Sequence, residues 1–312
     1  MNDLFKNTHT NIFLDSGDPA ETVQTLEMLG FLDGQTTNPS LIAKSPQVQE
    51  FLKTQKFTRA ELFEKYHQIA LQIRDVIPTG KISAEVYADA DSTVDELLEQ
   101  AYKIAQWFPG IFVKLPITTA GLAAAQQLVS DDISINMTLC FSQEQAAAVH
   151  MATKHATNAR VYVSPFIGRL DDIGQNGSDL IKNIQTMYMD WGSHVGVLGA
   201  SVRTIEHVNS CTEQEISAMT IPFKLVKEIS GQTTLSQTST ESGDQNTTTS
   251  SQPSPKLGEN PVGDSAESGE IHLVPIEYKE LEELPWAEYT IEHALTVKGL
   301  EKFAADWNAL CE

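Results

Sequence analysis

The stretch Ile111-Phe-Val-Lys-Leu-Pro-Ile117 is a short apolar run with a single lysine near its centre. Runs of this length that are rich in branched and aromatic side chains are typical of buried β-strands. Because alternate side chains of a strand point to opposite faces, Phe112, Lys114 and Pro116 share one face, while Val113 and Leu115 share the other. The stretch therefore predicts a buried strand that carries one charged side chain on an otherwise apolar element.

Seven further strand-like runs surround this one and alternate with helical patterns. The eight expected strands are residues 11–15, 34–38, 82–87, 111–117, 134–140, 160–166, 194–201 and 215–222. The helical patterns include residues 19–29, 93–106, 119–129, 143–156 and 177–188. Strict alternation indicates a parallel α/β sheet, and eight repeats predict closure into a (β/α)8 barrel, the TIM barrel. Residues 45–77 predict two extra helices after the second strand. Lys114 would then point into the barrel.

Two helix starts carry recognisable signals. Asp18 followed by Pro19 predicts an N-cap with proline at the first helical position. Ser142, with Gln145 three residues later, predicts a capping box.

The chain divides into three parts. Residues 1–230 hold the barrel, and residues 231–270, dominated by Ser, Thr, Gln, Gly and acidic residues, predict a disordered low-complexity insertion. Residues 271–312 complete the barrel domain with a helix over 295–310. Leu300, Phe303, Trp307 and Leu310 share one face of it, which must dock on its own barrel or on a neighbouring subunit.

Composition excludes several classes of function. Lys and Arg total 21 against 42 Asp and Glu, a formal charge of −21, which argues against nucleic acid or an anionic membrane surface as a partner. No run approaches the roughly 20 apolar residues that a membrane span requires. The N-terminus lacks the apolar stretch of a signal peptide. The three cysteines lie far apart without zinc spacing, so a reducing, cytoplasmic location without a metal is expected. Gly-rich nucleotide motifs are absent, and no cofactor is implied.

Lys114 is the first candidate for chemistry. Burial disfavours the charged ammonium, so its pKa should fall, and a free amine could then attack a carbonyl carbon. The alternative is an inward lysine that neutralises a carboxylate. The strand by itself does not separate the two.

Polar side chains within or at the ends of the other strands favour the chemical interpretation. They are Asp15, Asn38, Glu85, Asn136, Thr138 and Ser164. Barrel enzymes place their sites at the C-terminal ends of the strands, and so many buried polar groups would each need a partner. Arg169 and Arg203 follow the sixth and seventh strands and suit a phosphate group. Arg169 could equally pair with Asp171 or Asp172 at the surface.

Together these motifs resemble the transaldolase family, within it the small-subunit group that includes the fructose-6-phosphate aldolases. The matching runs are FLDSGDP (13–19), TTNPSLIAKS (36–45), ISAEV (82–86), FVKLPIT (112–118), GLAAAQQL (121–128), NMTLCFS (136–142), SPFIGRLDDIGQNGSDLI (164–181), LGASVR (198–203) and HALTVKGLEKFAADWNAL (293–310). Residues 231–285 have no counterpart in the family pattern.

The resemblance implies a transferase of the pentose phosphate pathway. It would move a dihydroxyacetone unit from fructose 6-phosphate or sedoheptulose 7-phosphate to an aldose phosphate. Lys114 would form the Schiff base, Asp15 would exchange the proton of the C4 hydroxyl, and Glu85 with Thr138 and a water would shuttle protons. The resemblance places Asn38, Asn136 and Ser164 on the three-carbon unit, Arg169, Ser201 and Arg203 on the phosphate, and Phe166 among the substrate contacts. It also implies a homo-oligomer, since members form rings or dimers.

Two alternatives differ in their consequences. A fructose-6-phosphate aldolase would release free dihydroxyacetone, but that subgroup carries glutamine where this chain has Glu85 and uses a tyrosine hydroxyl where Phe141 and Phe166 lie here. A catalytically silent barrel that binds a protein through residues 231–270 would predict the loss of Lys114, Asp15 or Glu85, and all three are present.

Overall fold

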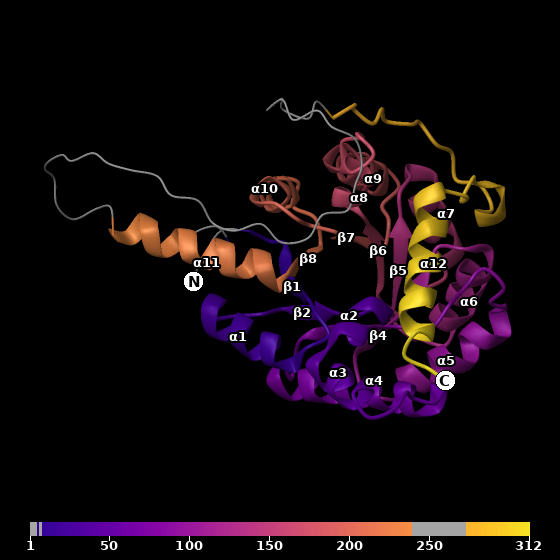
Figure 1. Cartoon of the computed structure of the whole chain (residues 1–312). Helices are drawn as coiled ribbons and strands as arrows, with labels where there is room; N and C mark the ends of the chain where they lie inside the picture. Colours follow the sequence, from indigo (N-terminus) through magenta and orange to yellow (C-terminus); the bar gives the residue numbers. More distant parts are fainter. Residues whose placement is uncertain (1–4, 6–7, 239–272) are drawn as a thin grey trace, which may run out of the picture.

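In the computed structural model of the chain, eight parallel strands close into a single barrel (Figure 1). The structure describes residue 5, residues 8–238 and residues 273–312. The strands follow the order of the sequence, and β1 pairs with β8 to close the sheet. Their bounds are β1 Asn11–Asp15, β2 Gly34–Thr36, β3 Lys81–Glu85, β4 Ile111–Pro116, β5 Ile135–Cys140, β6 Val161–Pro165, β7 Val195–Gly199 and β8 Ala218–Pro222. The expected TIM barrel is confirmed.

Helices surround the barrel, and those that precede β8 connect one strand to the next. The main ones are α1 Pro19–Leu29, α5 Val94–Ala105, α6 Thr119–Ser130, α7 Gln143–Thr153, α9 Gly177–Asp190, α10 Ile205–Glu213 and α11 Phe223–Thr238. The two extra helices expected after the second strand are α3 Pro46–Leu52 and α4 Arg59–Val76. Two short helices, α2 Pro39–Lys44 and α8 Ile167–Asp171, were not predicted, because one turn and a half of helix is too short to establish a periodic pattern.

The predicted helix starts have different outcomes. Asp18 accepts a hydrogen bond from the amide of Ala20 at 2.9 Å, with Pro19 at the first helical position, as expected. Ser142 accepts from the amide of Gln145 at 3.1 Å, but the second half of the capping box is wrong. The Gln145 side chain accepts instead from the amide of Phe141 at 2.7 Å and donates to the carbonyl of Ile291 at 2.8 Å. The Gln145 oxygen that would complete the capping box therefore binds the amide one residue before Ser142, while the amide nitrogen of the same side chain reaches the C-terminal segment.

The N-terminal half of the barrel interior is an apolar layer of inward-facing side chains. Its buried members are Phe13, Phe112, Tyr162, Leu198 and Ala218. A Cβ at Gly34 would lie 2.8 Å from the ring of Phe13, and one at Gly196 would lie 2.9 Å from the ring of Tyr162. The two glycines therefore leave room for the rings, which fill the barrel interior at the N-terminal ends of the strands.

The segment after residue 272 returns along the outside of α9 and α7 and ends in α12, Ala294–Asn308 (Figure 1). Helix α12 packs on α2 and β5 of its own barrel. The four apolar residues predicted to share one face are all buried, namely Leu300, Phe303, Trp307 and Leu310. Docking on its own barrel is thus the arrangement observed.

Helix α11 continues to Thr238 and so includes the first residues of the expected insertion, whose disorder stays a prediction. Most of that insertion, residues 239–270, lies outside the described residues. Among the helices that the structure describes, none combines the length and the apolar character needed to cross a membrane.

Candidate active site

A cavity of about 210 Å³ opens at the C-terminal ends of the strands. Eight of the expected site residues line it, namely Asp15, Asn38, Lys114, Ser164, Phe166, Arg169, Ser201 and Arg203. The other three, Glu85, Asn136 and Thr138, are buried within the strands that form it. The barrel therefore brings together residues that lie as far apart in the sequence as Asp15 and Arg203.

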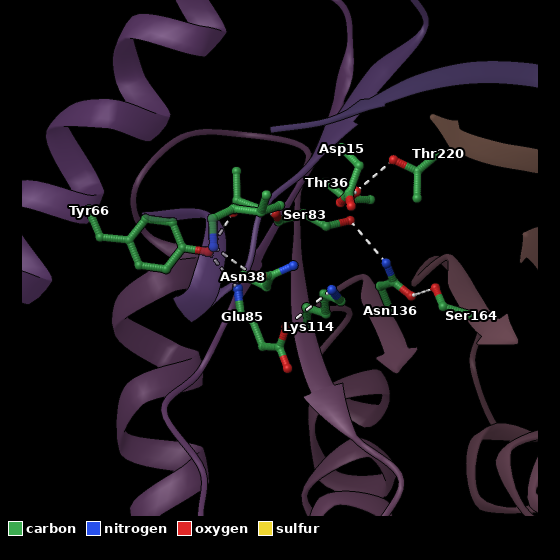
Figure 2. A network of polar contacts seen from close by, with 12 residues as sticks. Asp15, Thr36, Asn38, Tyr66, Ser83, Glu85, Lys114, Asn136, Ser164 and Thr220 are labelled. Atoms are coloured by element: carbon green, nitrogen blue, oxygen red, sulfur yellow. Dashed lines mark hydrogen bonds and ion pairs between the residues drawn. The ribbon is translucent and has the colours of Figure 1, made fainter. Parts of the chain in front are cut away.

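Lys114 and Glu85 form a buried ion pair on neighbouring strands (Figure 2). Their side chains are 5% and 3% exposed, and the Lys114 Nζ lies 3.1 Å from the Glu85 Oε2. The expectation that Lys114 points into the barrel is confirmed, and so is the presence of a carboxylate partner. Burial raises the pKa of Glu85, while the charge of Lys114 opposes that rise. The free-energy difference between the protonated and the ionised form of Glu85 at neutral pH is therefore smaller than for an exposed glutamate.

Asp15 is a second carboxyl, half-buried at the end of β1. Thr36 Oγ1 donates to its Oδ1 at 2.7 Å and lies 2.7 Å from Thr220 Oγ1. Burial raises the pKa of Asp15, and the charge of Lys114 is the largest effect that opposes this rise. The two carboxyls flank one amine but have different partners, an arrangement that suits separate proton-transfer roles. Thr36 and Thr220 were missed from the sequence, although Thr36 shares the inward face with Asn38 by strand alternation.

Asn136 and Ser164 form a second polar group inside the barrel. Ser164 Oγ donates to Asn136 Oδ1 at 2.6 Å, and Asn136 Nδ2 donates to Ser83 Oγ at 3.3 Å (Figure 2). These bonds fix the orientation of the Asn136 amide. Nearby on β5, the buried Thr138 Oγ1 has no hydrogen-bond partner among the described residues. A buried hydroxyl without a partner is uncommon and leaves Thr138 free to bind a water or a ligand atom.

Tyr66 of α4 supports the site from behind the strands and was also missed. Its hydroxyl accepts from the amide of Glu85 at 2.9 Å and hydrogen-bonds to Thr37 Oγ1, which donates to the carbonyl of Ser83 at 2.8 Å. Burial raises the pKa of Tyr66, so the hydroxyl stays neutral. The extra helix therefore fixes the ends of β2 and β3. A tyrosine within a helical pattern carries no sequence signal for this role.

Arg169, Ser201 and Arg203 lie at one side of the cavity. Arg169 is half-buried, and within the described chain no carboxylate pairs with it. The expected alternative, a surface pair with Asp171 or Asp172, is wrong because Asp171 binds His207 Nε2 at 2.6 Å and Asp172 pairs with Arg203. Burial, followed by the charge of Arg203, lowers the pKa of Arg169. Arg169, as a cation without a carboxylate partner among the described residues, is suited to attract an anionic ligand.

The lining also includes residues that the sequence analysis did not select. They are Thr36, Ser40, Leu41, Lys44, Ala200, Thr220, Lys302 and Phe303. Lys302 and Phe303 belong to α12, so the C-terminal helix forms part of the wall. Among the described residues, no cluster of three or more His, Cys, Asp or Glu side chains is arranged to hold a metal ion.

Comparison with known proteins agrees with this geometry. Residues 12–312 match the family described as Transaldolase/Fructose-6-phosphate aldolase. The chain belongs to this transaldolase/fructose-6-phosphate aldolase family. Its lysine-bearing barrel is therefore that of a transaldolase-family enzyme, and the expected family is confirmed.

Curated relatives of this transaldolase-family chain support the transferase branch. A probable transaldolase of Dehalococcoides mccartyi is 34% identical over 218 residues, covering 70% of this chain and 89% of the relative. A probable transaldolase of Caulobacter vibrioides is 37% identical over 211 residues, covering 68% of this chain and 84% of the relative. A probable transaldolase of Herpetosiphon aurantiacus is 36% identical, covering 70% of this chain and 86% of the relative.

Proposed function

We propose that the chain is a transaldolase that moves a dihydroxyacetone unit from a ketose phosphate to an aldose phosphate through a Schiff base on Lys114. The donors would be sedoheptulose 7-phosphate or fructose 6-phosphate of the pentose phosphate pathway. The observation that carries the proposal is the buried Lys114–Glu85 pair in the barrel mouth, with Asp15 as a second, half-buried carboxyl of raised pKa. An amine with two carboxyls of raised pKa provides a nucleophile and two proton carriers.

Formation of the Schiff base begins with a proton transfer. Glu85, 3.1 Å from Nζ, takes the proton of the ammonium, and its raised pKa favours the neutral acid. The free amine attacks C2 of the ketose, and the carbonyl oxygen becomes a hydroxyl group. Protonation lets that hydroxyl leave as water, which forms the protonated imine. The Thr138 hydroxyl, which has no hydrogen-bond partner within the described part of the chain, would hold the water that relays these protons.

Carbon–carbon cleavage then requires a base near C4. Asp15 takes the proton of the C4 hydroxyl, the C3–C4 bond breaks, and its electron pair moves into the imine to give an enamine. The aldose phosphate leaves, and an acceptor aldose reverses the same steps. Asn38, Asn136 and Ser164 would hydrogen-bond the three-carbon unit that stays on Lys114. The fixed Asn136 amide reduces the reorganisation needed during this step.

The phosphate would bind Arg169, Ser201 and Arg203. All three line the cavity that contains Lys114, and no carboxylate of residues 8–238 or 273–312 pairs with Arg169. A phosphate held at this side would direct C2 of the ketose toward the lysine.

Glu85 and two phenylalanines distinguish the transaldolase from a fructose-6-phosphate aldolase. Phe166 lines the cavity, and Phe141 packs against it with ring centroids 5.5 Å apart, so neither supplies a hydroxyl. Without a tyrosine hydroxyl at these positions to protonate the enamine, the three-carbon unit should remain on Lys114 until an acceptor arrives.

The test is the release of glyceraldehyde 3-phosphate from fructose 6-phosphate with and without erythrose 4-phosphate. Release that requires the acceptor supports the transaldolase. Equal release without it would mean an aldolase, and no release under either condition would mean a catalytically silent barrel.

We also propose that the protein is a cytoplasmic homo-oligomer. The three cysteines are free and buried, as in a reducing compartment, and family members form rings or dimers. Sedimentation velocity at several protein concentrations tests the assembly, and a single monomeric species throughout would contradict it.

A further inference from the structure

We propose that Gly299 and Phe303 of α12 position the Arg169 guanidinium, so that the C-terminal helix sets the affinity of the active site for the substrate phosphate. The inference rests on the phosphate-binding role proposed for Arg169. It makes Gly299 and Phe303 positioning residues, and it gives a function to a helix that lies outside the eight repeats of the barrel.

The Arg169 guanidinium lies between two aromatic rings. Its Cζ is 5.0 Å from the ring centroid of Phe166, at the start of α8, and 5.6 Å from that of Phe303 on α12. Phe303 is itself buried and lines the cavity. Because no carboxylate among the described residues pairs with Arg169, these ring contacts hold the guanidinium without occupying its hydrogen-bond donors. The donors stay available for an anion.

Gly299 lets α12 approach the arginine closely. A Cβ built at this position would lie 2.8 Å from a terminal nitrogen of Arg169 and 2.6 Å from Cδ2 of Leu139. Both distances are shorter than normal van der Waals contact. Each clashing atom is the far end of a flexible side chain, so an alanine could be accommodated by moving these two side chains without unfolding the barrel.

The helix itself cannot easily retreat to relieve such a clash. Near its start, Thr296 Oγ1 donates to the carbonyl of Leu139 at 2.9 Å and accepts from Gln145 Nε2 at 2.9 Å. Near its end, Ser40 of α2 hydrogen-bonds to Asp306. With α12 anchored on both sides of Gly299, displacement of the Arg169 guanidinium is the easier response.

The first experiment compares Gly299→Ala with the wild type in three measurements. They are the KM and kcat for fructose 6-phosphate with erythrose 4-phosphate, the inhibition constant of inorganic phosphate, and borohydride trapping of dihydroxyacetone on Lys114. We expect both the KM and the inhibition constant to rise about tenfold, the loss of roughly one charge-assisted hydrogen bond. Trapping should stay within about twofold, because dihydroxyacetone carries no phosphate.

Matched variants separate a local effect from a general one. Val297→Ala changes an exposed residue of the same helix, 52% exposed, and should leave all three measurements unchanged. Phe303→Leu keeps the helix face apolar while removing the ring, and should raise the phosphate inhibition constant even if Gly299→Ala folds poorly. In an Arg169→Ala background, Gly299→Ala should add no further loss of phosphate binding.

Other results would overturn the inference in identifiable ways. Unchanged phosphate inhibition in both Gly299→Ala and Phe303→Leu would show that α12 does not position Arg169. An equal loss of dihydroxyacetone trapping would place the effect at Leu139 and the adjacent Thr138 instead. If Arg169→Ala itself leaves phosphate inhibition unchanged, the phosphate-binding role fails first, independently of α12.

Discussion

The two halves of the barrel interior are built from the same strands but carry opposite kinds of side chain. Phe13, Phe112, Tyr162, Leu198 and Ala218 form the apolar layer of the N-terminal half. Two residues further along each strand, the inward side chains line the cavity instead, namely Asp15, Lys114, Ser164, Ala200 and Thr220. One step of strand alternation, about 7 Å, separates a packed core from the candidate active site. The lower layer stabilises the barrel, which lets the upper layer hold costly buried charges.

The largest effect should distinguish the two inward lysines. Lys114→Ala removes the proposed nucleophile, so we expect turnover to fall by at least about 10³-fold and borohydride trapping to disappear. Lys81 lies in the lower half, where its Nζ donates to the Tyr162 hydroxyl at 3.1 Å. Lys81→Ala should leave turnover within a few-fold of wild type. Steady-state kinetics and circular dichroism on both variants provide the measurement. Turnover of Lys114→Ala within tenfold of wild type would rule out the Schiff-base role.

A second pair of variants should separate a loss of stability in the apolar layer from a loss of activity at the cavity. Phe112 is buried in the apolar layer, and Phe112→Ala should lower the free energy of unfolding by about 3–5 kcal/mol through the cavity it creates. Catalysis by the protein that remains folded should change little. Thr138→Val, in the half of the barrel that holds the cavity, removes a hydroxyl that has no hydrogen-bond partner among the described residues. It should reduce turnover with little loss of stability. Denaturant unfolding and kinetics on the same samples measure both. The comparison fails if Phe112→Ala loses catalysis at full stability.

The smallest expected effect is a pH dependence of stability that originates at the cavity. Burial raises the pKa of Asp15 above its ordinary value of 3.8. Between the pKa of Asp15 in the unfolded chain and its higher pKa in the folded protein, the folded state binds more protons than the unfolded state. The contribution of Asp15 to stability therefore decreases as the pH rises through that interval. Asp15→Asn should remove a negative slope of up to about 1.4 kcal/mol per pH unit.

An exposed carboxyl supplies the control for that measurement. Hydrogen bonds from Asn158 and Thr157 lower the pKa of Asp132, so its contribution is lost as pH falls rather than as it rises. The difference in unfolding free energy between wild type and Asp132→Asn should therefore change with pH in the opposite sense. The Asp132 slope lies below pH 3.8 and the Asp15 slope lies above it. Urea unfolding from about pH 2 to about pH 7 therefore tests both variants, and slopes of the same sign would contradict the assignment.

Much of the fold could be predicted because its signals are local. Helix α1 and strand β1 were predicted with their observed bounds, since Asp18 and Pro19 mark the helix start and an uninterrupted apolar run marks the strand. The capping box at Ser142 failed in its second half because the Gln145 side-chain oxygen accepts from the amide of Phe141, with its nitrogen bound to the C-terminal segment. Helix α2 was missed because six residues are too few to show helical periodicity.

The sequence by itself determined the eightfold alternation, the inward direction of Lys114 and the polar ends of the strands. These properties depend on side-chain period and on residues a few positions apart. The tertiary structure decided which partner each group meets: Glu85 beside Lys114, Tyr66 behind Glu85, and α12 against Arg169. The physical reason is that these contacts join residues 19 to 130 positions apart, and only the register of the closed sheet and the docking of α12 bring them within bonding distance.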